Sequence, residues 1–363
     1  MPGFHLFVSH FNILTTFSFS LKIIDNFDTI NSASYSAVDD PDSSAPRELI
    51  ETCKKGRISS NANPPTIEIL VNRGNNNGII DSNTLSRQCG MNSICVIQSG
   101  TTLRMDSNVN VGALIVRGTV EWNDSTQKDQ SLFLCAGYVA VESQGKWSMN
   151  LQQKNGWIYI KENRAVHPML RERAFGAAAG SRTDNPIVEI EGRELKRTWS
   201  LLSEPLDVGD NRMKLLHNPS LMGWRVGDRI SIAPTESHSK GVGEEFRIVA
   251  IEQDATLVLN KSARSRFNAE FISPLHGDQP SLMSAEVMNL DRNIVITGDD
   301  FTHVPCDPSL PEAVRGEQTS VKGCRCSSFR TTCTVGLHQA QMNGGIARIQ
   351  NTRVEKCGQR GML

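Results

Sequence analysis

The sequence of 363 residues has few of the features that define several large protein classes. It contains no run of about 20 uninterrupted apolar residues, so a membrane-spanning helix is not expected. Its 38 basic and 39 acidic residues leave a formal net charge of -1 with no basic block, which argues against nucleic acid as a partner. Glycine follows no period of three and no heptads run through the chain, which excludes collagen and a coiled coil.

Helical periodicity and several enzyme signatures are also missing. The best helical candidate, residues 162–179, has Pro168 in its interior and predicts at most short helical turns on a loop. The chain has no phosphate-binding loop, no Rossmann fingerprint and no Gly-x-Ser-x-Gly elbow. Nucleotide-dependent and serine-hydrolase functions are therefore not expected.

Cysteine is the residue type that is present in excess of what packing requires. There are nine, four of them between residues 306 and 333. With two candidate glycosylation sequons, at Asn123 and Asn260, they predict a secreted or cell-surface protein with disulfides. The segment 4–24 is apolar-rich but interrupted by Ser and Thr, so it is a weak signal segment.

Six of the cysteines are disulfide candidates. They are Cys89, Cys95, Cys306, Cys324, Cys326 and Cys333. The first two would close a small loop. The last four, completed by His303 and His338, could instead bind zinc, but the usual pair of Cys-x-x-Cys knuckles is missing, so disulfides are favoured. No metal or other cofactor is assigned, and the sequence leaves open whether calcium is needed.

Beyond a leader at residues 1–65, which is predicted to be disordered, the chain reads as short strands. Runs of four to six β-branched and apolar residues alternate with Gly, Asn and Asp, as in strands separated by turns. The runs are 66–71, 94–98, 113–116, 138–141, 157–160, 187–190, 229–233, 246–251, 256–259, 293–297 and 346–349.

Three early runs resemble one another when they are aligned on their glycines. Each passes from a strand through a bend at Gly100, Gly118 or Gly145 into a second strand, so the pattern recurs after 18 and then 27 residues. Such spacing is typical of the coils of a parallel β-solenoid, in which each coil buries its inward residues by stacking on the next. An antiparallel sandwich is the alternative, but hairpin dipeptides such as Asn-Gly are rare here.

A later block carries a more specific pattern. It comprises residues 197–202 (RTWSLL), 223–235 (GWRVGDRISIAPT), 244–248 (EEFRI) and 285–298 (AEVMNLDRNIVITG). This block resembles the segment that follows the G8 domain in a family of animal cell-surface proteins, which includes hyaluronan-degrading proteins and fibrocystins. The preceding glycine-punctuated block resembles the G8 domain itself, and residues 345–359 resemble the first rungs of the family's right-handed parallel β-helix.

The resemblance implies a mostly β architecture of two parts. A G8 β-solenoid-like domain is expected at residues 66–193. The first rungs of a right-handed parallel β-helix are expected at 194–363, where the chain stops before the family's histidine-containing rungs. The resemblance therefore also implies that the sequence is a fragment, and that an activity on later rungs would be missing.

Candidate site residues lie in the later block. Asp228 ends a Gly-Asp turn and either caps backbone amides there or forms a carboxylate pair with Glu244 or Glu245, as hydrolysis of a glycosidic bond requires. His238 lies between them in the chain and is either a solvated loop residue or a general acid or base. Trp199 and Trp224 are candidates for stacking on sugar rings, and filling the corners of coils is the alternative for the tryptophans.

Two classes of function remain open. The first is a polysaccharide-binding or matrix-interaction module, in which a rigid strand ladder presents polar and aromatic side chains to a chain of sugars. The second, implied by the resemblance, is a glycan-cleaving enzyme of the hyaluronan-degrading type. Binding is favoured because no compact acid–base pair stands out in the sequence.

Overall fold

The fold is mostly β. A computed structural model describes residues 46–54, 66–69, 78–124, 131–235, 243–272, 281–305 and 332–360. Within these ranges, no helix combines the length and the apolar character needed to cross a membrane. The chain forms two compact units: one comprises the residues up to Gly192 together with those from Asn293 onward, and the other comprises Arg193–Arg292. We call them the solenoid unit and the inserted unit.

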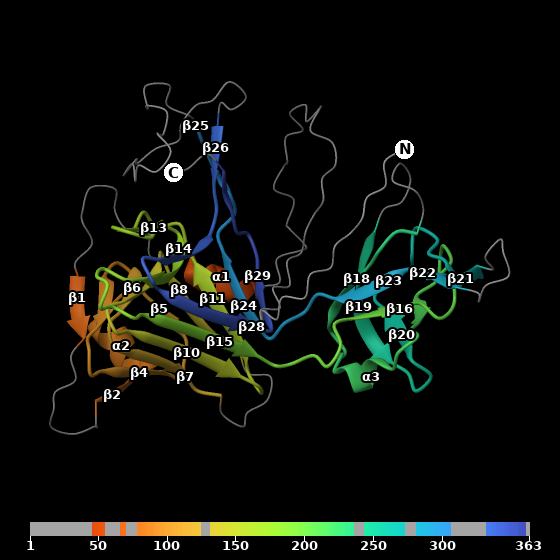
Figure 1. Ribbon diagram of the computed structural model, residues 1–363, viewed down its shortest axis with the longest axis horizontal. Coiled ribbons are helices and arrows are strands. Elements are labelled where there is room, and N and C mark those ends of the chain that lie inside the picture. The colour runs from red at the N-terminus through yellow and green to blue at the C-terminus, as the bar shows by residue number, and fades with distance from the viewer. Residues whose placement is uncertain are drawn as a thin grey trace. The chain divides into compact units, whose positions relative to one another are not determined.

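The solenoid unit consists of three parallel sheets (Figure 1). Sheet A contains β1 (Thr66–Ile69), β3 (Ile94–Ile97), β6 (Ala113–Val116), β9 (Val139–Glu142), β14 (Ala174–Ala178) and β27 (His338–Met342). Sheet B contains β2 (Ile79–Asp81), β4 (Thr102–Met105), β7 (Thr119–Trp122), β10 (Lys146–Leu151), β15 (Ile187–Gly192) and β28 (Ile346–Gln350). Sheet C contains β5 (Val109–Asn110), β8 (Ser131–Ala136), β11 (Asn155–Ile160), β24 (Ile294–Gly298) and β29 (Thr352–Val354).

The chain visits the sheets in the order A, B, C in each full coil, which is the winding of a β-helix-like solenoid. Cys95 pairs with Leu114 and Leu114 pairs with Val139, so the three runs stack in the expected order, at offsets of 19 and 25 residues where their glycines are spaced by 18 and 27. A Cβ atom at Gly118 or Gly145 would collide with carbonyl oxygens of neighbouring coils, so these corners require glycine. Parallel pairing of successive coils confirms the solenoid and excludes the sandwich for this unit.

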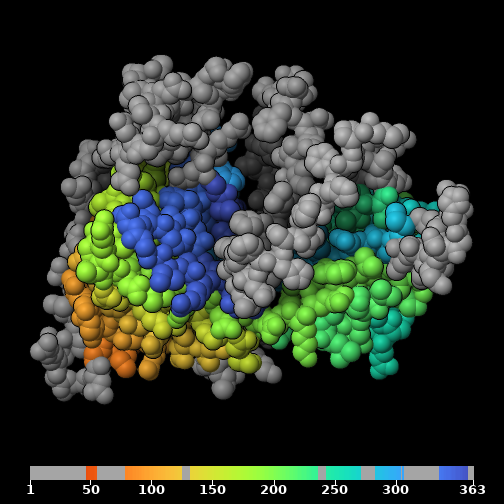
Figure 2. Space-filling view, in the orientation of Figure 1, coloured from red at the N-terminus to blue at the C-terminus, as the bar shows by residue number. Residues whose placement is uncertain are grey.

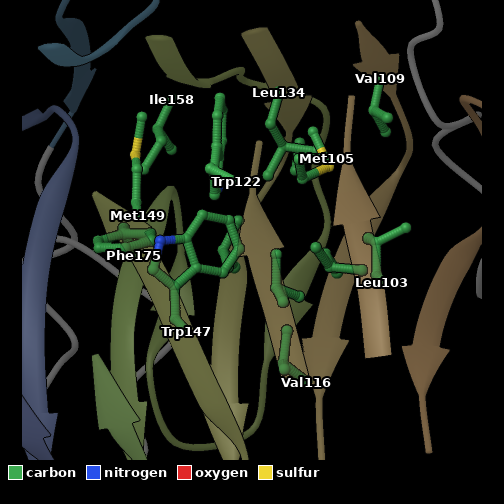
Figure 3. Packing of buried hydrophobic residues seen from close by; sticks show 14 of the residues in the cluster. Leu103, Met105, Val109, Val116, Trp122, Leu134, Trp147, Met149, Ile158 and Phe175 are labelled. Atoms are coloured by element: carbon green, nitrogen blue, oxygen red, sulfur yellow. The ribbon is translucent and has the colours of Figure 1, made fainter. Parts of the chain in front are cut away.

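Large apolar side chains fill the space between the three sheets (Figure 3). Trp147 is fully buried at the centre, with its ring 6.1 Å from that of Trp122 and 5.5 Å from that of Phe175. Trp122 is also buried, so these tryptophans fill the interior of coils rather than presenting their rings to a ligand. Stacked aromatic and aliphatic layers of this kind give a coil stack its stability.

One end of the solenoid core is closed by α2 (Ser82–Gln88). The helix begins after Asp81, whose side chain accepts a hydrogen bond of 2.7 Å from the backbone N–H of Thr84. Its residue Leu85 is fully buried in the core. The helix therefore occupies, in the first coil, the position that a strand of sheet C takes in later coils.

A second helix covers the outer face of sheet C. α1 (Arg47–Cys53) places Leu49 and Cys53, one helical turn apart, against Phe133, Trp157 and other apolar residues of that face. A disulfide joins Cys53 to Cys135 of β8. Residues 46–54 therefore differ from the predicted disordered leader: two apolar side chains on one helix face and a covalent link hold them in place.

The outer face of sheet A is covered by the segment 161–173, which we call the cover segment. It contains the short hairpin of β12 (Val166–His167) and β13 (Arg171–Glu172). Small residues of sheet A, such as Ala140 and Ala178, pack against Leu170 and other apolar residues of this segment. The prediction of short helical turns for residues 162–179 was wrong, because this region forms a hairpin and then the buried strand β14.

The inserted unit is a small antiparallel structure. Its main strands are β16 (Trp199–Leu201), β17 (Arg212–Lys214), β18 (Arg229–Ile232), β19 (Glu244–Ile251), β20 (Thr256–Leu259) and β23 (Glu286–Asn289). They are ordered β16-β23-β18-β19-β20-β17, and an antiparallel bridge between Leu202 and Leu215 links the two outermost strands, so the ladder surrounds one apolar core. The unit also contains α3 (Pro219–Met222) and the hairpin β21 (Ala269–Ile272) with β22 (Ser281–Ser284).

The domain division follows from where this unit enters the solenoid. The chain leaves sheet B at Gly192 and returns to sheet C at Asn293, so the inserted unit occupies a single corner of one coil. The unit starts at Arg193, one residue before the expected start of the second domain at residue 194. Residues 293–363, however, belong with the solenoid unit. A further antiparallel group, β25 (Thr302–Pro305), β26 (Thr332–Val335) and β30 (Gln359–Arg360), lies between and after the last coils.

The corner that accepts the insertion is lined by asparagines. Register places Asn155, Asn293 and Asn351 one above the other. Asn155 is the first residue of β11, and Asn293 and Asn351 directly precede β24 and β29. The amide of Asn293 donates hydrogen bonds of 2.8 Å to the carbonyls of Leu151 and Lys154 in the preceding coil. Asn351 donates likewise to the carbonyl of Gly192 at 3.4 Å, so both amides satisfy backbone groups at a corner where the sheet ladder is interrupted.

Candidate functional site

Sheet B presents an outward face of polar side chains in register. Arg104, Glu121, Ser148, Glu189 and Arg348 form one row across five successive strands. Asn150, Glu191 and Gln350 form a second row beside it. All members of the second row are exposed, as are the arginines and Glu121 of the first. We call them the charged row and the amide row.

Contacts within these rows hold their side chains in place. Glu189 is 3.1 Å from Lys146 Nζ and 2.7 Å from an Arg348 guanidinium nitrogen. Hydrogen bonds from Lys146 and Arg348, in that order, lower the pKa of Glu189. In the amide row, Asn150 Nδ2 donates to a Glu191 carboxylate oxygen at 3.2 Å. Each side chain keeps further donors or acceptors that can be offered to a ligand.

Asp228 serves the turn that precedes β18. Its Oδ2 accepts a hydrogen bond of 2.9 Å from the backbone N–H of Arg225 and one of 2.7 Å from Asn289 Nδ2. Burial raises the pKa of Asp228, and these two hydrogen bonds oppose that effect. The geometry matches the interpretation in which Asp228 caps backbone amides at a Gly-Asp turn, with Gly227 at φ +95°.

Glu244 lies away from Asp228 along β19. Ile248 exchanges backbone hydrogen bonds with the Gly227–Asp228 turn, whereas Glu244 lies four residues earlier on β19 and pairs with Ile232. At ~3.3 Å per strand residue, that places Glu244 roughly 13 Å along the strand from the residue opposite Asp228. The two carboxyls of a glycosidase lie about 5–10 Å apart. The register therefore does not bring Asp228 and Glu244 together as an acid–base pair.

Each glutamate has a local partner instead. The buried carboxylate of Glu244 accepts hydrogen bonds from the backbone N–H groups of Arg264, at 3.0 Å, and Ser265, at 2.7 Å, so it fixes the loop after β20. Glu245 is exposed and lies 3.7 Å from an Arg229 guanidinium nitrogen. His238 lies outside the described residues.

The two tryptophan candidates occupy different environments. Trp224 is 3% exposed, lies in the core of the inserted unit and donates from Nε1 to the carbonyl of Arg197 at 2.8 Å. Its ring is therefore not presented to a sugar. Trp199 is 43% exposed, and the Arg197 guanidinium lies 5.0 Å from its ring centroid. Sequence gave no means of separating these two residues, because both lie in strand-like runs of similar composition.

The cysteines are resolved in part. Cys89 is joined to Cys95, as the small-loop interpretation predicts, and Cys53 is joined to Cys135, a pair that the sequence did not single out. Cys357 is a free thiol, and burial raises its pKa. The candidates Cys306, Cys324 and Cys326 lie outside the described residues, and of Cys333 only the backbone, in β26, is described. Among the described residues no group of three or more His, Cys, Asp and Glu side chains could hold a metal ion.

Sequence reasoning missed the buried polar residues of the cover segment. Lys161 Nζ donates to Asn110 Oδ1 at 2.6 Å, and burial lowers the pKa of Lys161 to about 8. The fully buried His167 contacts Glu142 Oε1 through Nε2 at 2.8 Å, while its Nδ1 accepts from the backbone N–H of Leu170 at 3.0 Å. These contacts within the protein anchor the cover segment to sheet A and sheet C.

Arg173 anchors the far end of the same segment. Its buried guanidinium donates to the carbonyls of Asp299, Asp300 and Val335. The only available sequence signal was the density of polar residues between two strand-like runs, which is equally typical of a solvated loop. The distinction depends on tertiary contacts with residues more than 100 positions away.

The two sequon asparagines are both exposed. Asn123 directly follows β7 on sheet B, and Asn260 directly follows β20 in the inserted unit.

Comparison with known proteins identifies no relative: no protein-family model matches the chain and no curated protein matches it. The function is therefore inferred from the outward rows of sheet B and from the resemblance of the sequence motifs.

Proposed function

We propose that the protein is an extracellular or cell-surface polysaccharide-binding protein that acts in matrix interaction. In this proposal the early coils form a G8 domain and the later coils are the first rungs of a right-handed parallel β-helix. The glycine-cornered coils and the motifs of residues 197–298 support the family assignment. Two disulfides support an oxidising compartment, because such bonds persist mainly outside the cytosol.

The observation that carries the binding proposal is the pair of outward rows on sheet B. Neighbouring strands lie ~4.8 Å apart, so the five strands of the charged row span roughly 19 Å. This repeat is close to the length of one ring in an extended polysaccharide. A linear glycan that runs along the coil axis could therefore meet an equivalent set of donors and acceptors at each successive sugar.

The chemistry of the rows suits hydroxyl-rich ligands. Carboxylates accept hydrogen bonds from sugar hydroxyls, guanidinium groups donate to hydroxyl and ring oxygens, and amides do both. Because the charged row holds two arginines and two glutamates, the face has no strong preference for one sign of charge. The proposal therefore includes neutral as well as acidic polysaccharides.

The test is a panel of neutral and acidic polysaccharides, with retention and chain length measured in parallel. Asn150→Ala/Gln350→Ala should weaken binding by about 1–3 kcal/mol, or roughly 5- to 150-fold, through loss of two hydrogen-bonding side chains. Asn92→Ala/Gln253→Ala is the matched control, because it makes the same changes at exposed positions outside the rows. Equal loss in both variants, or no binding by the wild type, would contradict the proposal.

The same assay addresses the alternative, a glycan-cleaving enzyme of the hyaluronan-degrading type. Binding alone leaves the chain length of the polysaccharide unchanged. Shortening that Asp228→Asn abolishes would support the enzyme, since that variant keeps an oxygen acceptor for the turn but removes the ionisable group. Shortening that survives Asp228→Asn would place the chemistry elsewhere.

A further inference from the structure

Asn123 lies at the edge of the face that the proposed function uses. Its backbone N–H donates to the carbonyl of Met105 at 2.9 Å, so it continues β7 by one residue. Glu121 pairs with Ser148, and extending this parallel register by two residues places Asn123 beside Asn150. Burial alternates along β7, with Glu121 and Asn123 exposed and Trp122 buried, so Asn123 faces outward at the end of the amide row.

Asp124, the middle residue of the first sequon, is bound by residues that follow much later in the chain. The Asp124 carboxylate accepts hydrogen bonds from the backbone N–H groups of Gln152, at 2.7 Å, Gln153, at 3.0 Å, and Lys154, at 2.9 Å. These donors follow Asp124 by 28 to 30 residues. At ~5–20 residues per second, synthesis of that stretch takes roughly 1.5–6 s, during which the Asp124 side chain lacks these three partners.

The second sequon is closed by residues that precede it. Asn260 Oδ1 accepts a hydrogen bond of 2.8 Å from the backbone N–H of Arg247, and the Asn260 N–H donates to the Arg247 carbonyl at 3.0 Å. Arg247 is made 13 residues earlier, so these contacts can form as soon as the β19–β20 hairpin does, within about 1–10 μs. The window for modifying Asn260 is therefore much shorter than that for Asn123.

From this geometry we propose that Asn123 carries an N-linked glycan in preference to Asn260, and that this glycan lies over the amide row of sheet B and limits access to it. The second clause rests on the proposed function, whereas the first does not. The donor is a lipid-linked oligosaccharyl diphosphate. Asn123 Nδ2 forms a bond to the anomeric carbon of the donor's first sugar. The bond from that carbon to the diphosphate oxygen breaks, and the lipid-linked diphosphate leaves with the electron pair. Nδ2 gives up one proton.

Cell-free translation of the full chain behind a cleavable signal peptide, in the presence of microsomes, tests occupancy. Chains protected from added protease are compared before and after removal of N-glycans. The wild type and Asn260→Gln should show one glycan-dependent mobility shift, and Asn123→Gln and Ser125→Ala should lose it. Peptide mass spectrometry should find the modification at Asn123. Protected chains that are unmodified at Asn123, or modified mainly at Asn260, would overturn the proposal.

Delaying closure of the sequon gives a second test of the timing argument. Arg247→Pro removes the backbone N–H from which Asn260 Oδ1 accepts a hydrogen bond. It should raise the fraction of chains glycosylated at Asn260 and leave the fraction glycosylated at Asn123 unchanged. No rise would show that hairpin closure does not limit modification there.

The masking step is tested by binding. Asn123→Gln should bind the retained polysaccharide several-fold more tightly than the glycosylated wild type, and Asn260→Gln should bind as the wild type does. Equal affinities would refute masking and leave occupancy untouched. If no form of the protein binds any polysaccharide while Asn123 is modified, the proposed function fails and the modification stands.

Discussion

Breaking the Cys53–Cys135 disulfide should destabilise the protein more than breaking the Cys89–Cys95 disulfide. The first bond closes a loop with a sequence separation of 82 residues and the second a loop with a separation of 6. A crosslink removes conformational freedom from the unfolded chain, and the effect grows with the logarithm of loop length. The loop-entropy relation gives about 4.5 kcal/mol for the long loop and about 2.2 kcal/mol for the short one at 25 °C.

The comparison is well matched, because all four cysteines are at most 1% exposed and each variant makes the same side-chain change. Cys53→Ala/Cys135→Ala and Cys89→Ala/Cys95→Ala would be unfolded with urea without reductant, and the free energies of unfolding compared. Trp122 and Trp147 report the transition of the solenoid core by fluorescence. A difference of roughly 2 kcal/mol is expected.

The result that would refute this reasoning is an equal or reversed order of the two variants. Since the α1 helix covers apolar residues of sheet C, loss of native packing could add to the cost of the long-loop variant but could not reverse the order. A reversed order would mean that the short loop acts through native geometry around the end of the core. It would then be wrong to treat the unfolded chain as the source of the stabilisation.

Three further predictions concern packing, charge and architecture. Trp147→Ala should cost about 3–5 kcal/mol of unfolding free energy in urea titrations, and a cost under 1 kcal/mol would contradict central packing. Asp228→Ala should cost about 1–3 kcal/mol by losing two hydrogen bonds. Burial raises the pKa of Asp228 in the folded state. Its contribution to stability is therefore complete below the unfolded pKa and declines as pH rises through the folded pKa. Asp228→Asn should lack this decline in thermal unfolding measured from pH 3 to 7, and a pH profile identical to that of the wild type would refute this prediction. The third variant lacks residues 193–292 and joins Gly192 to Asn293 through three residues, the number that connects β10 to β11. It should remain a folded solenoid that unfolds cooperatively. A protease-sensitive product would show that the solenoid needs the inserted unit.

Much of the strand content could be predicted from sequence, because β-branched runs between turn residues carry a local signal. Each predicted run overlaps a strand in the structure. The strand β14 was missed because its sequence, Ala-Phe-Gly-Ala-Ala, has low intrinsic strand propensity. Its small residues are required by tertiary packing: a Cβ atom at Gly176 would collide with the carbonyl oxygen of Ala340 in the next coil.

Pairing between distant strands could not be predicted in the same way. Alternating strands look alike whether their partners are parallel or antiparallel, so the sequence did not reveal that the chain leaves the solenoid at Gly192 and returns at Asn293. The same limit applies to the candidate site. The Gly-Asp turn fixed one interpretation of Asp228 locally, but its distance from Glu244 depends on the register of β18 and β19.

The α2 helix also bears on association between molecules. β5 is the outermost strand of sheet C at that end of the stack, and α2 lies against it. An uncovered edge strand offers its N–H and C=O groups to any other strand, which is a common route to fibrous aggregation. The backbone groups of a helix bond mainly within the helix, so α2 gives a passing strand no template at this edge. A variant that unfolds α2 without removing a core side chain, such as Ser86→Pro at an exposed position of the helix, should therefore make the protein aggregate while its coils are still folded.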